Sequence, residues 1–261
     1  MKTTKKITCT ISMKVFDETQ FIQYPLYVQP KLNGVYCELN TDGILVSRTG
    51  KVFPAVQKAF NWPKPFTTMK GELYCHGKSL QEILSGVTPD EPNEMTRGLE
   101  LAVFDCELTT NFSYRYHQVC CFVEPLPFKF QHILRVLAIL CNSHSELLEQ
   151  YQLALSRGYE GIVIRDSFGG VWKKKPAQDA EFLCIGVIEG KGKRQGHVGK
   201  FQCVTADGKR FNCGGGRVSY SELARMFAKP PVGKMLTLRY YSTSDDGIPL
   251  CAQFISVRDY N

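Results

Sequence analysis

Gln29-Pro30-Lys31-Leu32-Asn33-Gly34-Val35 is the most informative segment of this chain. Apolar runs flank it, so Lys31 is predicted at the end of a strand, directly before a glycine turn. A lysine amine is protonated and inert at neutral pH, and it becomes a nucleophile only with partial burial, a cationic or metal neighbour and a fixed position. An Asn-Gly turn between two paired strands would give the same residues. The rest of the chain has to distinguish these two interpretations.

The composition describes a globular protein with one large core or two smaller ones: 261 residues, 43% hydrophobic and 22% charged. The cysteines are scattered without any CxxC spacing, which predicts free thiols in a reducing compartment instead of zinc ligands. The apolar runs are too short to cross a bilayer, and the N-terminus lacks the apolar core of a secretion signal. We therefore expect a protein without membrane segments that is not secreted. Its net charge of +7 is consistent with a polyanionic partner.

The pattern of apolar residues predicts an α+β protein with two domains. Alternating residues between 24 and 53 predict an antiparallel meander, and further strands are expected at 69–74, 100–106 and 161–165. Helices are expected at 55–61, at 80–84 and across 130–157, with a break near 141–143. After residue 177, five short strands with one helix after the third have the layout of a small Greek-key barrel of the OB type. The predicted domains are residues 1–177, with antiparallel sheets and flanking helices, and residues 178–261.

Downstream of Lys31, five further clusters stand where strands begin or end. A buried glutamate is rare unless it is paired or functional, which favours a role for Glu72 after a glycine in an apolar strand. Alternate lysines on an extended segment share one face, which favours a phosphate-binding pair beside the domain boundary. The other clusters have ordinary structural explanations when each is taken alone: a solvated basic turn, a core strand and a strand start. The clusters are Ser47-Arg48-Thr49-Gly50-Lys51, Glu72, Phe104, Glu160-Gly161 and Trp172-Lys173-Lys174-Lys175-Pro176.

Taken in this order, the clusters resemble the motifs of the covalent nucleotidyltransferases, the superfamily of polynucleotide ligases and messenger-RNA capping enzymes. The resemblance is closest to minimal ATP-dependent DNA ligases of phage or virus type. It continues through the C-terminal region, which holds Glu189-Gly190-Lys191-Gly192-Lys193-Arg194, Gly199-Lys200-Phe201, Pro230-Pro231-Val232-Gly233-Lys234, and residues 254–258. An ordered set of motifs over two domains is far more specific than any single one. The resemblance implies a nucleotidyltransferase (adenylation) domain followed by an OB-fold barrel.

The resemblance also implies the reaction. The lysine attacks the α-phosphate of ATP, the adenylate passes to the 5′-phosphate of a nick in duplex DNA, and the 3′-hydroxyl displaces AMP. Lys31 is the nucleophile by this carry-over, Lys173 and Lys175 neutralise charge, and Arg258 orients the departing pyrophosphate. Nucleotide contacts are expected from Arg48, Glu72, Phe104, Glu160, Lys173 and Lys175, and Mg²⁺ or Mn²⁺ contacts from Glu160 and Glu72. Contacts to DNA are expected from Asn33, Arg48, Lys191, Lys193, Arg194 and Lys200.

The chain departs from the family pattern at two positions, with Asn33 where the family usually has aspartate and Tyr36 where it has arginine. These departures keep two alternatives open: an RNA ligase or capping-type enzyme, and an OB-type nucleic-acid-binding protein with weakened catalysis. We expect a monomer that acts on nicked double-stranded DNA. Its expected location is the cytoplasm or the nucleic-acid compartment of an infected host.

Overall fold

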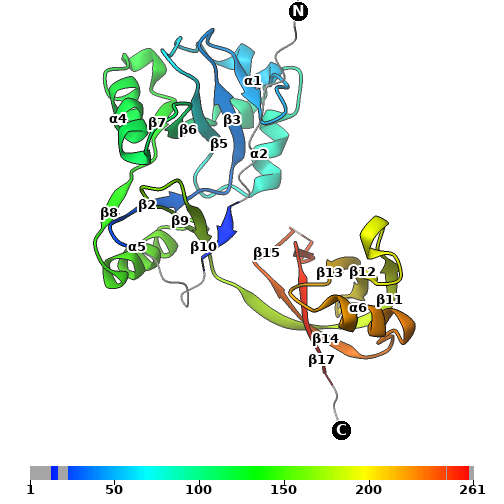
Figure 1. The fold of residues 1–261 in the computed structure, drawn as a ribbon. Coiled ribbons are helices and arrows are strands. Elements are labelled where there is room, and N and C mark those ends of the chain that lie inside the picture. Colours follow the sequence, from blue (N-terminus) through cyan, green and yellow to red (C-terminus); the bar gives the residue numbers. More distant parts are fainter. Residues whose placement is uncertain (1–12, 17–22, 245, 259–261) are drawn as a thin grey trace, which may run out of the picture. The chain divides into compact units, whose positions relative to one another are not determined.

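The computed structural model describes residues 13–16, 23–244 and 246–258. The chain divides into two compact units, residues 1–175 and 176–261, and each is described here by itself (Figure 1). None of the helices in the described residues is long and apolar enough to cross a membrane. The cysteines in this part of the chain are free thiols.

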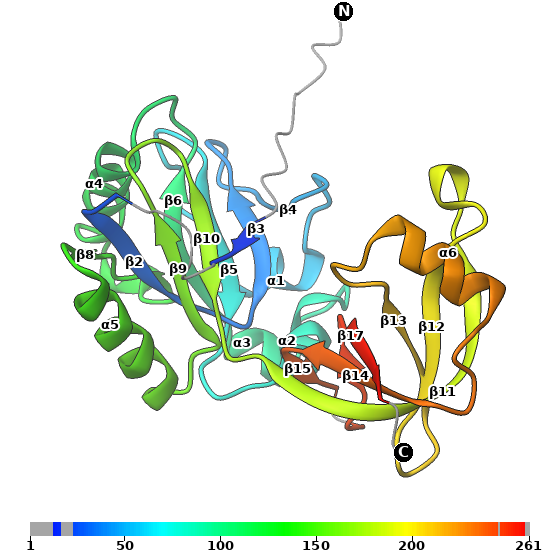
Figure 2. The ribbon, with the colours of Figure 1, turned by 60° about the horizontal axis from the view of Figure 1, so that its bottom comes forward.

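The first sheet of unit 1 carries the beginning of the opening stretch, up to Lys31. Its strand order is β1 (Lys14–Val15), β10 (Val171–Lys174), β9 (Gly161–Arg165), β2 (Leu26–Lys31) and β8 (Ile139–Cys141). One face packs on helix α5 (His144–Ser156), which begins at the N-cap Ser143 and runs along β2 and β9 (Figure 2). The core between them is apolar and includes Leu26, Val28, Leu147, Ile162 and Ile164. The opposite face of β2 and β9 is therefore left for polar side chains.

The second sheet of unit 1 has the order β4 (Leu45–Ser47), β3 (Val35–Leu39), β5 (Met69–Tyr74), β6 (Glu100–Cys106) and β7 (Ile133–Arg135). It shares the larger core of unit 1 with short helices and with α4, which packs on β6 and β7. These helices are α1 (Pro54–Ala59), α2 (Leu80–Val87), α3 (Glu94–Arg97) and α4 (Phe112–Val123). A single 3₁₀ turn, η1 (Phe128–Phe130), precedes β7.

The predicted meander of residues 24–53 is wrong in one respect that changes the meaning of the opening stretch. β3 and β4 pair as expected, but β2 pairs with β9 and β8 in the other sheet. Asn33 and Gly34 are thus not the turn of a hairpin, because the strands they connect belong to different sheets. The chain crosses from one sheet to the other directly after Lys31.

The expected helix over residues 130–157 is also wrong in its first part. Residues 133–135 and 139–141 form β7 and β8, and the helix begins only at His144. The apolar residues of this segment fit a helical spacing, but β7 pairs with β6 and β8 pairs with β2. Pairing with sheet edges outweighs a weak local preference.

A buried polar network joins the two sheets. Arg165 on β9 donates from Nη1 to Asp105 Oδ2 on β6 at 3.2 Å, and from Nε to Gln29 Oε1 on β2 at 3.1 Å. Gln29 Nε2 donates to the backbone oxygens of Phe104 (3.1 Å) and Val136 (3.3 Å). Arg115 on α4 donates from Nε to Asp105 Oδ1 at 2.7 Å. The network fixes β2 and β9 relative to β6, and the candidate site is built on these strands.

Unit 2 is a closed barrel with the strand order β11 (Gln178–Glu189), β12 (Val198–Val204), β13 (Arg210–Gly214), β17 (Gln253–Arg258) and β14 (Met235–Tyr240). Helix α6 (Tyr220–Ala228) follows the third strand, β13, and contacts β12. The barrel interior is filled by apolar side chains, among them Phe201, Leu236 and Leu238. The turn between β11 and β12 holds η2 (Gly192–Arg194), and a small hairpin, β15 (Ser242–Thr243) with β16 (Pro249–Leu250), precedes β17.

Candidate active site

The face of the first sheet away from α5 gathers the predicted lysines. In the strand register, Lys31 pairs with Gly161, Gln29 pairs with Val163, and Val163 pairs with Lys173. Paired residues point to the same face, and residues two apart on one strand share that face. The side chains of Lys31 and Lys173 therefore lie on one face of the sheet. Lys174, between the two predicted lysines, points the other way and lies 4.8 Å from the ring of Tyr151 on α5.

Glu160 lies between two of these lysines. Its Oε2 accepts a hydrogen bond from Lys31 Nζ, and its Oε1 lies 3.7 Å from Lys175 Nζ. Lys31 Nζ also donates to the backbone oxygen of Leu32 at 3.2 Å. The backbone N–H of Glu160 donates to the backbone oxygen of Lys31 at 3.0 Å, which ties the start of β9 to the end of β2. The three side chains form a charged cluster with a net positive charge.

Glu72 faces the same region from β5. Its Oε2 accepts a hydrogen bond from the backbone N–H of Gly34 at 3.0 Å. Burial raises the pKa of Glu72, while Lys31, the Gly34 N–H and Arg48 act in the opposite direction. A Cβ on Gly34 would stand 2.6 Å from the Leu73 backbone oxygen, so this close approach requires glycine. The glycine of the opening stretch thus lets a half-buried carboxylate approach the segment that follows Lys31.

Arg48, Tyr36 and Phe104 extend the site along the second sheet. Tyr36 pairs with Glu72 in the β3–β5 register. The guanidinium carbon of Arg48 lies 4.6 Å from the centroid of the Tyr36 ring. The ring of Phe104, on β6, lies 6.2 Å from the ring of Tyr36 and is tilted against it by 46°. The structure therefore brings together the predicted residues Lys31, Arg48, Glu72, Phe104, Glu160, Lys173 and Lys175.

Other predicted residues lie elsewhere. Asn33 is in the connection between the two sheets, beside Gly34. Arg258 is on β17 of unit 2. Its Nε lies 2.8 Å from Glu181 Oε1 and donates to Thr237 Oγ1 at 3.1 Å. The basic residues expected to contact DNA are exposed around the β11–β12 turn of unit 2: Lys191, Lys193, Arg194 and Lys200. None of these four forms an ion pair with a residue that the structure describes. Arg194 lies 6.0 Å from the ring of Tyr220 at the start of α6.

Two groups of residues were not found from the sequence. Asp105 and Arg165 are buried charges within apolar strands, and that signal is visible in the sequence because charged residues are rarely buried without partners. For Tyr36, the sequence indicated only that the residue departs from the family pattern. Its contact with Arg48 depends on the pairing of β3 with β4 and could not be read from the sequence.

Glu160 and Glu72 are the candidate metal ligands of this site. No group of three or more His, Cys, Asp or Glu side chains able to hold a metal ion occurs in the described part of the chain. Glu160 nevertheless lies near enough to Glu72 for its charge to act on the pKa of Glu72. Mg²⁺ is commonly held by one or two carboxylates, with phosphate oxygens and water as its other ligands. These two residues fit a magnesium ion that arrives with a nucleotide.

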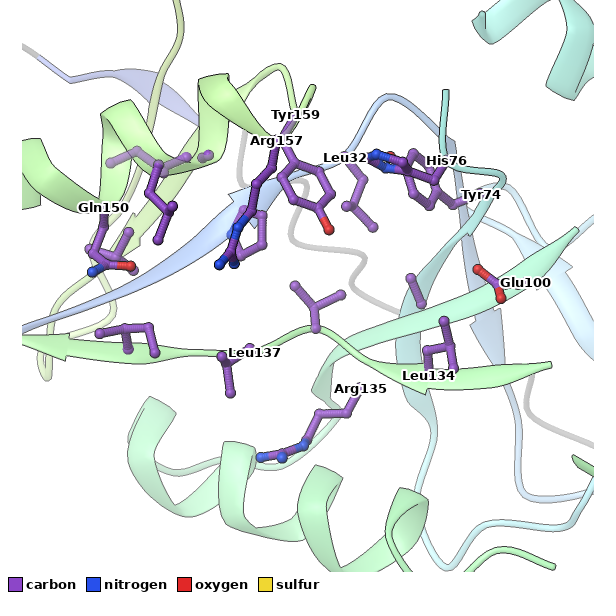
Figure 3. A pocket seen from close by; sticks show the side chains of 18 residues that line it. Leu32, Tyr74, His76, Glu100, Leu134, Arg135, Leu137, Gln150, Arg157 and Tyr159 are labelled. Carbon is purple, nitrogen blue, oxygen red and sulfur yellow. The ribbon is translucent and has the colours of Figure 1, made fainter. Parts of the chain in front are cut away.

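A cavity of about 390 Å³ lies on the opposite side of β2 from Lys31 (Figure 3). Pro30 and Leu32, on either side of Lys31, line it, together with Tyr159, whose hydroxyl points inward. The hydroxyl of Tyr74 lies 2.6 Å from Nδ1 of His76 at another part of its wall. None of the lysines of the candidate site lines this cavity, so it is separate from the candidate site.

Comparisons with known proteins give consistent results over both units. The family model described as "DNA ligase OB-like domain" matches residues 189–258. A DNA ligase of African swine fever virus (isolate Warthog/Namibia/Wart80/1980) is 28% identical over 270 residues, which cover 89% of this chain and 63% of the relative. The chain thus spans less than two thirds of that relative's length.

Solved structures add the fold. One from a study titled "DNA binding with a minimal scaffold: Structure-function analysis of Lig E DNA ligases" has a TM-score of 0.76 and 25% identity, covering 95% of this chain and 98% of that one. Chlorella virus DNA ligase-adenylate has a TM-score of 0.53 at 20% identity, covers 96% of this chain and 98% of that one, and supports the fold alone. The fold is mixed α/β, like these ligases. The resemblance predicted from the ordered motifs is confirmed: in sequence and in fold, this chain is similar to the minimal ATP-dependent DNA ligases of viral type.

Proposed function

We propose that this chain is an ATP-dependent DNA ligase that seals nicks between a 5′-phosphate and a 3′-hydroxyl. The observation that carries the proposal is the placement of Lys31 at a sheet crossing, in contact with Glu160 and beside Glu72. The similarity to viral ligases supports the choice of DNA over the RNA-ligase and capping alternatives. In this proposal, residues 1–177 are the adenylation domain and residues 178–261 the OB-fold domain.

The first step would occur at Lys31 Nζ. The amine attacks the α-phosphorus of ATP, an N–P bond forms, the bond to the β-phosphate oxygen breaks, and pyrophosphate leaves. Attack requires the amine to lose a proton, whereas an adjacent carboxylate favours the protonated form. Lys175 lies on the other side of Glu160 and competes for the same carboxylate. A bound nucleotide that draws Glu160 away from Lys31 would therefore help to release the nucleophile.

The remaining residues would position the nucleotide and neutralise charge. Lys173 and Lys175 are placed to contact phosphate oxygens, because both are cationic and stand on or directly after the strand beside β9. Glu72 would bind the ribose, Phe104 would stack on adenine, and Arg48 would contact a phosphate. Glu160 and Glu72 would hold Mg²⁺ or Mn²⁺, which supplies neutralisation of phosphate charge when bound. Arg258 would orient the departing pyrophosphate.

The proposed partner is nicked double-stranded DNA, bound by a monomer in a compartment that holds nucleic acid. Lys191, Lys193, Arg194 and Lys200 are exposed without carboxylate partners among the described residues, which suits contact with a phosphate backbone and not with base edges. Asn33, with its amide group beside the crossing, is proposed to contact the nick. The proposed enzyme recognises the structure of the nick and not its sequence.

Labelling tests the chemistry. The purified protein, incubated with Mg²⁺ and ATP labelled at the α-phosphate, is expected to carry a covalent label that survives denaturation and alkali and is released by acid, as a bond between nitrogen and phosphorus requires. GTP is expected to give no label. Lys31→Ala should abolish both labelling and sealing of nicked DNA. Lys174→Ala is the matched control, because Lys174 lies on the opposite face of the same sheet, and it should keep both activities. Labelling of the Lys31→Ala protein would overturn the assignment, and failure of the wild type to label would favour a binding protein without catalysis.

A further inference from the structure

We propose that Tyr36 is a positioning residue whose ring holds the Arg48 guanidinium near Glu72, where it binds the 5′-phosphate at a nick. This inference rests on the proposed ligase function and adds a residue to it. The structure shows how the Arg48 cation is held beside this ring.

The cation is placed by strand pairing. In the β3–β4 register Cys37 pairs with Ser47, so the next positions of the ladder, Tyr36 and Arg48, face each other. The guanidinium carbon lies over the ring, 4.6 Å from its centroid, within the range of cation–π attraction. Arg48 is otherwise at the exposed start of the turn that follows β4. Without the ring, nothing in its immediate sequence would keep this long side chain in one position.

The ring itself is fixed on two sides. The Tyr36 hydroxyl donates to Glu38 Oε1 at 2.9 Å, and Phe104 packs beside the ring at 6.2 Å. The Tyr36 side chain is half-buried, and burial and the nearby Glu38 raise the pKa of its hydroxyl, which stays protonated. A neutral, anchored ring offers Arg48 a flat surface without neutralising its charge.

The charge of Arg48 is available to a ligand. Its side chain makes no hydrogen bond and no ion pair with any residue that the structure describes. The guanidinium therefore keeps its N–H donors for an external acceptor, and phosphate oxygens match their geometry. Arg48 also lies near enough to Glu72 to act on the pKa of that carboxyl. A phosphate bound at Arg48 would thus lie near Glu72, whose carboxyl also interacts with Lys31.

A double-mutant cycle tests whether Tyr36 acts through Arg48. Binding of the full chain to a nicked duplex with a 5′-phosphate, and to the same duplex with a 5′-hydroxyl, is measured for the wild type, Tyr36→Leu, Arg48→Ala and the double variant. Tyr36→Leu should weaken binding of the 5′-phosphate nick about two- to fivefold, the range of an exposed cation–π contact. It should change binding of the 5′-hydroxyl nick less, and it should have no further effect once Arg48 is alanine.

Tyr36→Phe separates the ring from its hydroxyl and is expected to bind the 5′-phosphate nick within about twofold of the wild type. If Tyr36→Leu does not fold, Tyr36→Met takes its place in the cycle. Equal losses from Tyr36→Leu with and without Arg48, or equal losses for the two nicks, would overturn the positioning role. Failure of the proposed function has a different signature: the wild type would form no covalent adenylate and would seal no nick.

Discussion

At the scale of single residues, Glu72 is where two opposing effects meet. Burial raises the pKa of its carboxyl above 4.5, although Lys31 and the Gly34 N–H partly oppose the shift. A carboxyl whose pKa is raised by folding binds its proton more tightly in the folded state, so the free energy of unfolding falls as pH rises through that window. The wild type should therefore lose stability above pH 4.5, until the folded-state carboxyl has ionised.

Glu72→Gln should remove this loss, because the amide does not titrate but can still accept from Gly34. Chemical denaturation at several pH values between about 4.5 and 7.5 measures the free energy of unfolding. In the wild type this one group should contribute a slope of at most about 1.4 kcal/mol per pH unit. Glu107→Gln, at an exposed position, is the control and should follow the wild type. A Glu72→Gln protein with the wild-type pH slope would show that Glu72 is not the group responsible.

The chemistry-bearing residues were predictable where their type and order were informative. Lys31, Glu72, Glu160 and Lys175 were each named from the sequence. In the structure Glu160 pairs with both lysines, and the charge of Lys31 acts on the pKa of Glu72. Their separate roles remain predictions until they are tested. The partnership of Arg48 with Tyr36 was not predictable, because it depends on which positions of β3 and β4 stand opposite each other.

At the scale of elements, the junction of the two sheets depends on Asp105. This carboxylate accepts from Arg165, which is buried on β9, and from Arg115 on α4. Asp105→Asn would remove the negative charge and leave a buried arginine without compensation. Breaking a buried ion pair in this way costs about 3–5 kcal/mol of unfolding free energy. The expected result is a large loss of stability, measured by chemical denaturation.

The control for Asp105 is an ion pair on the surface of the same unit. Lys58 and Glu91 are paired, but both side chains are well exposed, at 50% and 78%. Exposed pairs contribute about 0–1 kcal/mol, so Glu91→Gln should be nearly neutral. Similar losses from Asp105→Asn and Glu91→Gln would show that the network does not hold the sheets together.

Secondary structure was predictable where local pattern and pairing agree. The strands Met69–Tyr74, Glu100–Cys106 and Gly161–Arg165 were expected at these positions and are observed there. Residues 133–141 were mistaken for helix because Ile133, Val136 and Leu137 fit a helical spacing. The two sheets supply edge partners for β7 and β8, and those partners are distant in sequence. No local pattern reports a partner that lies far along the chain.

The sheet crossing after Lys31 was not predictable for the same reason. An Asn-Gly pair between two apolar strands is a strong local signal for a hairpin. In this chain β2 pairs with β9, more than a hundred residues away, and β3 pairs with β5. The sheet crossing gives Lys31 contacts from both sheets that a hairpin position would not provide.

At the scale of the whole molecule, each unit has its own apolar core and its own chemistry. The proposed nucleophile Lys31 and the carboxylates Glu72 and Glu160 belong to unit 1, whereas the exposed basic turn belongs to unit 2. Binding of DNA and formation of the adenylate should therefore be separable by substitution. Variants of the β11–β12 turn should change the first property and leave the second unchanged.

Replacing both Lys193 and Arg194 by alanine makes this prediction measurable. Each contact between a protein cation and a phosphate that is lost should reduce the slope of log binding constant against log salt concentration by about 0.9 for duplex DNA. The double variant should therefore show a reduction of up to about 1.8. Binding of the nicked duplex should weaken most at low salt, while labelling by ATP should match the wild type. Lys209→Ala is the control in the same barrel, because Lys209 is paired with Asp207 at 2.9 Å. An unchanged salt slope in the double variant, or an equal change in the Lys209 control, would contradict a DNA-binding role for this turn.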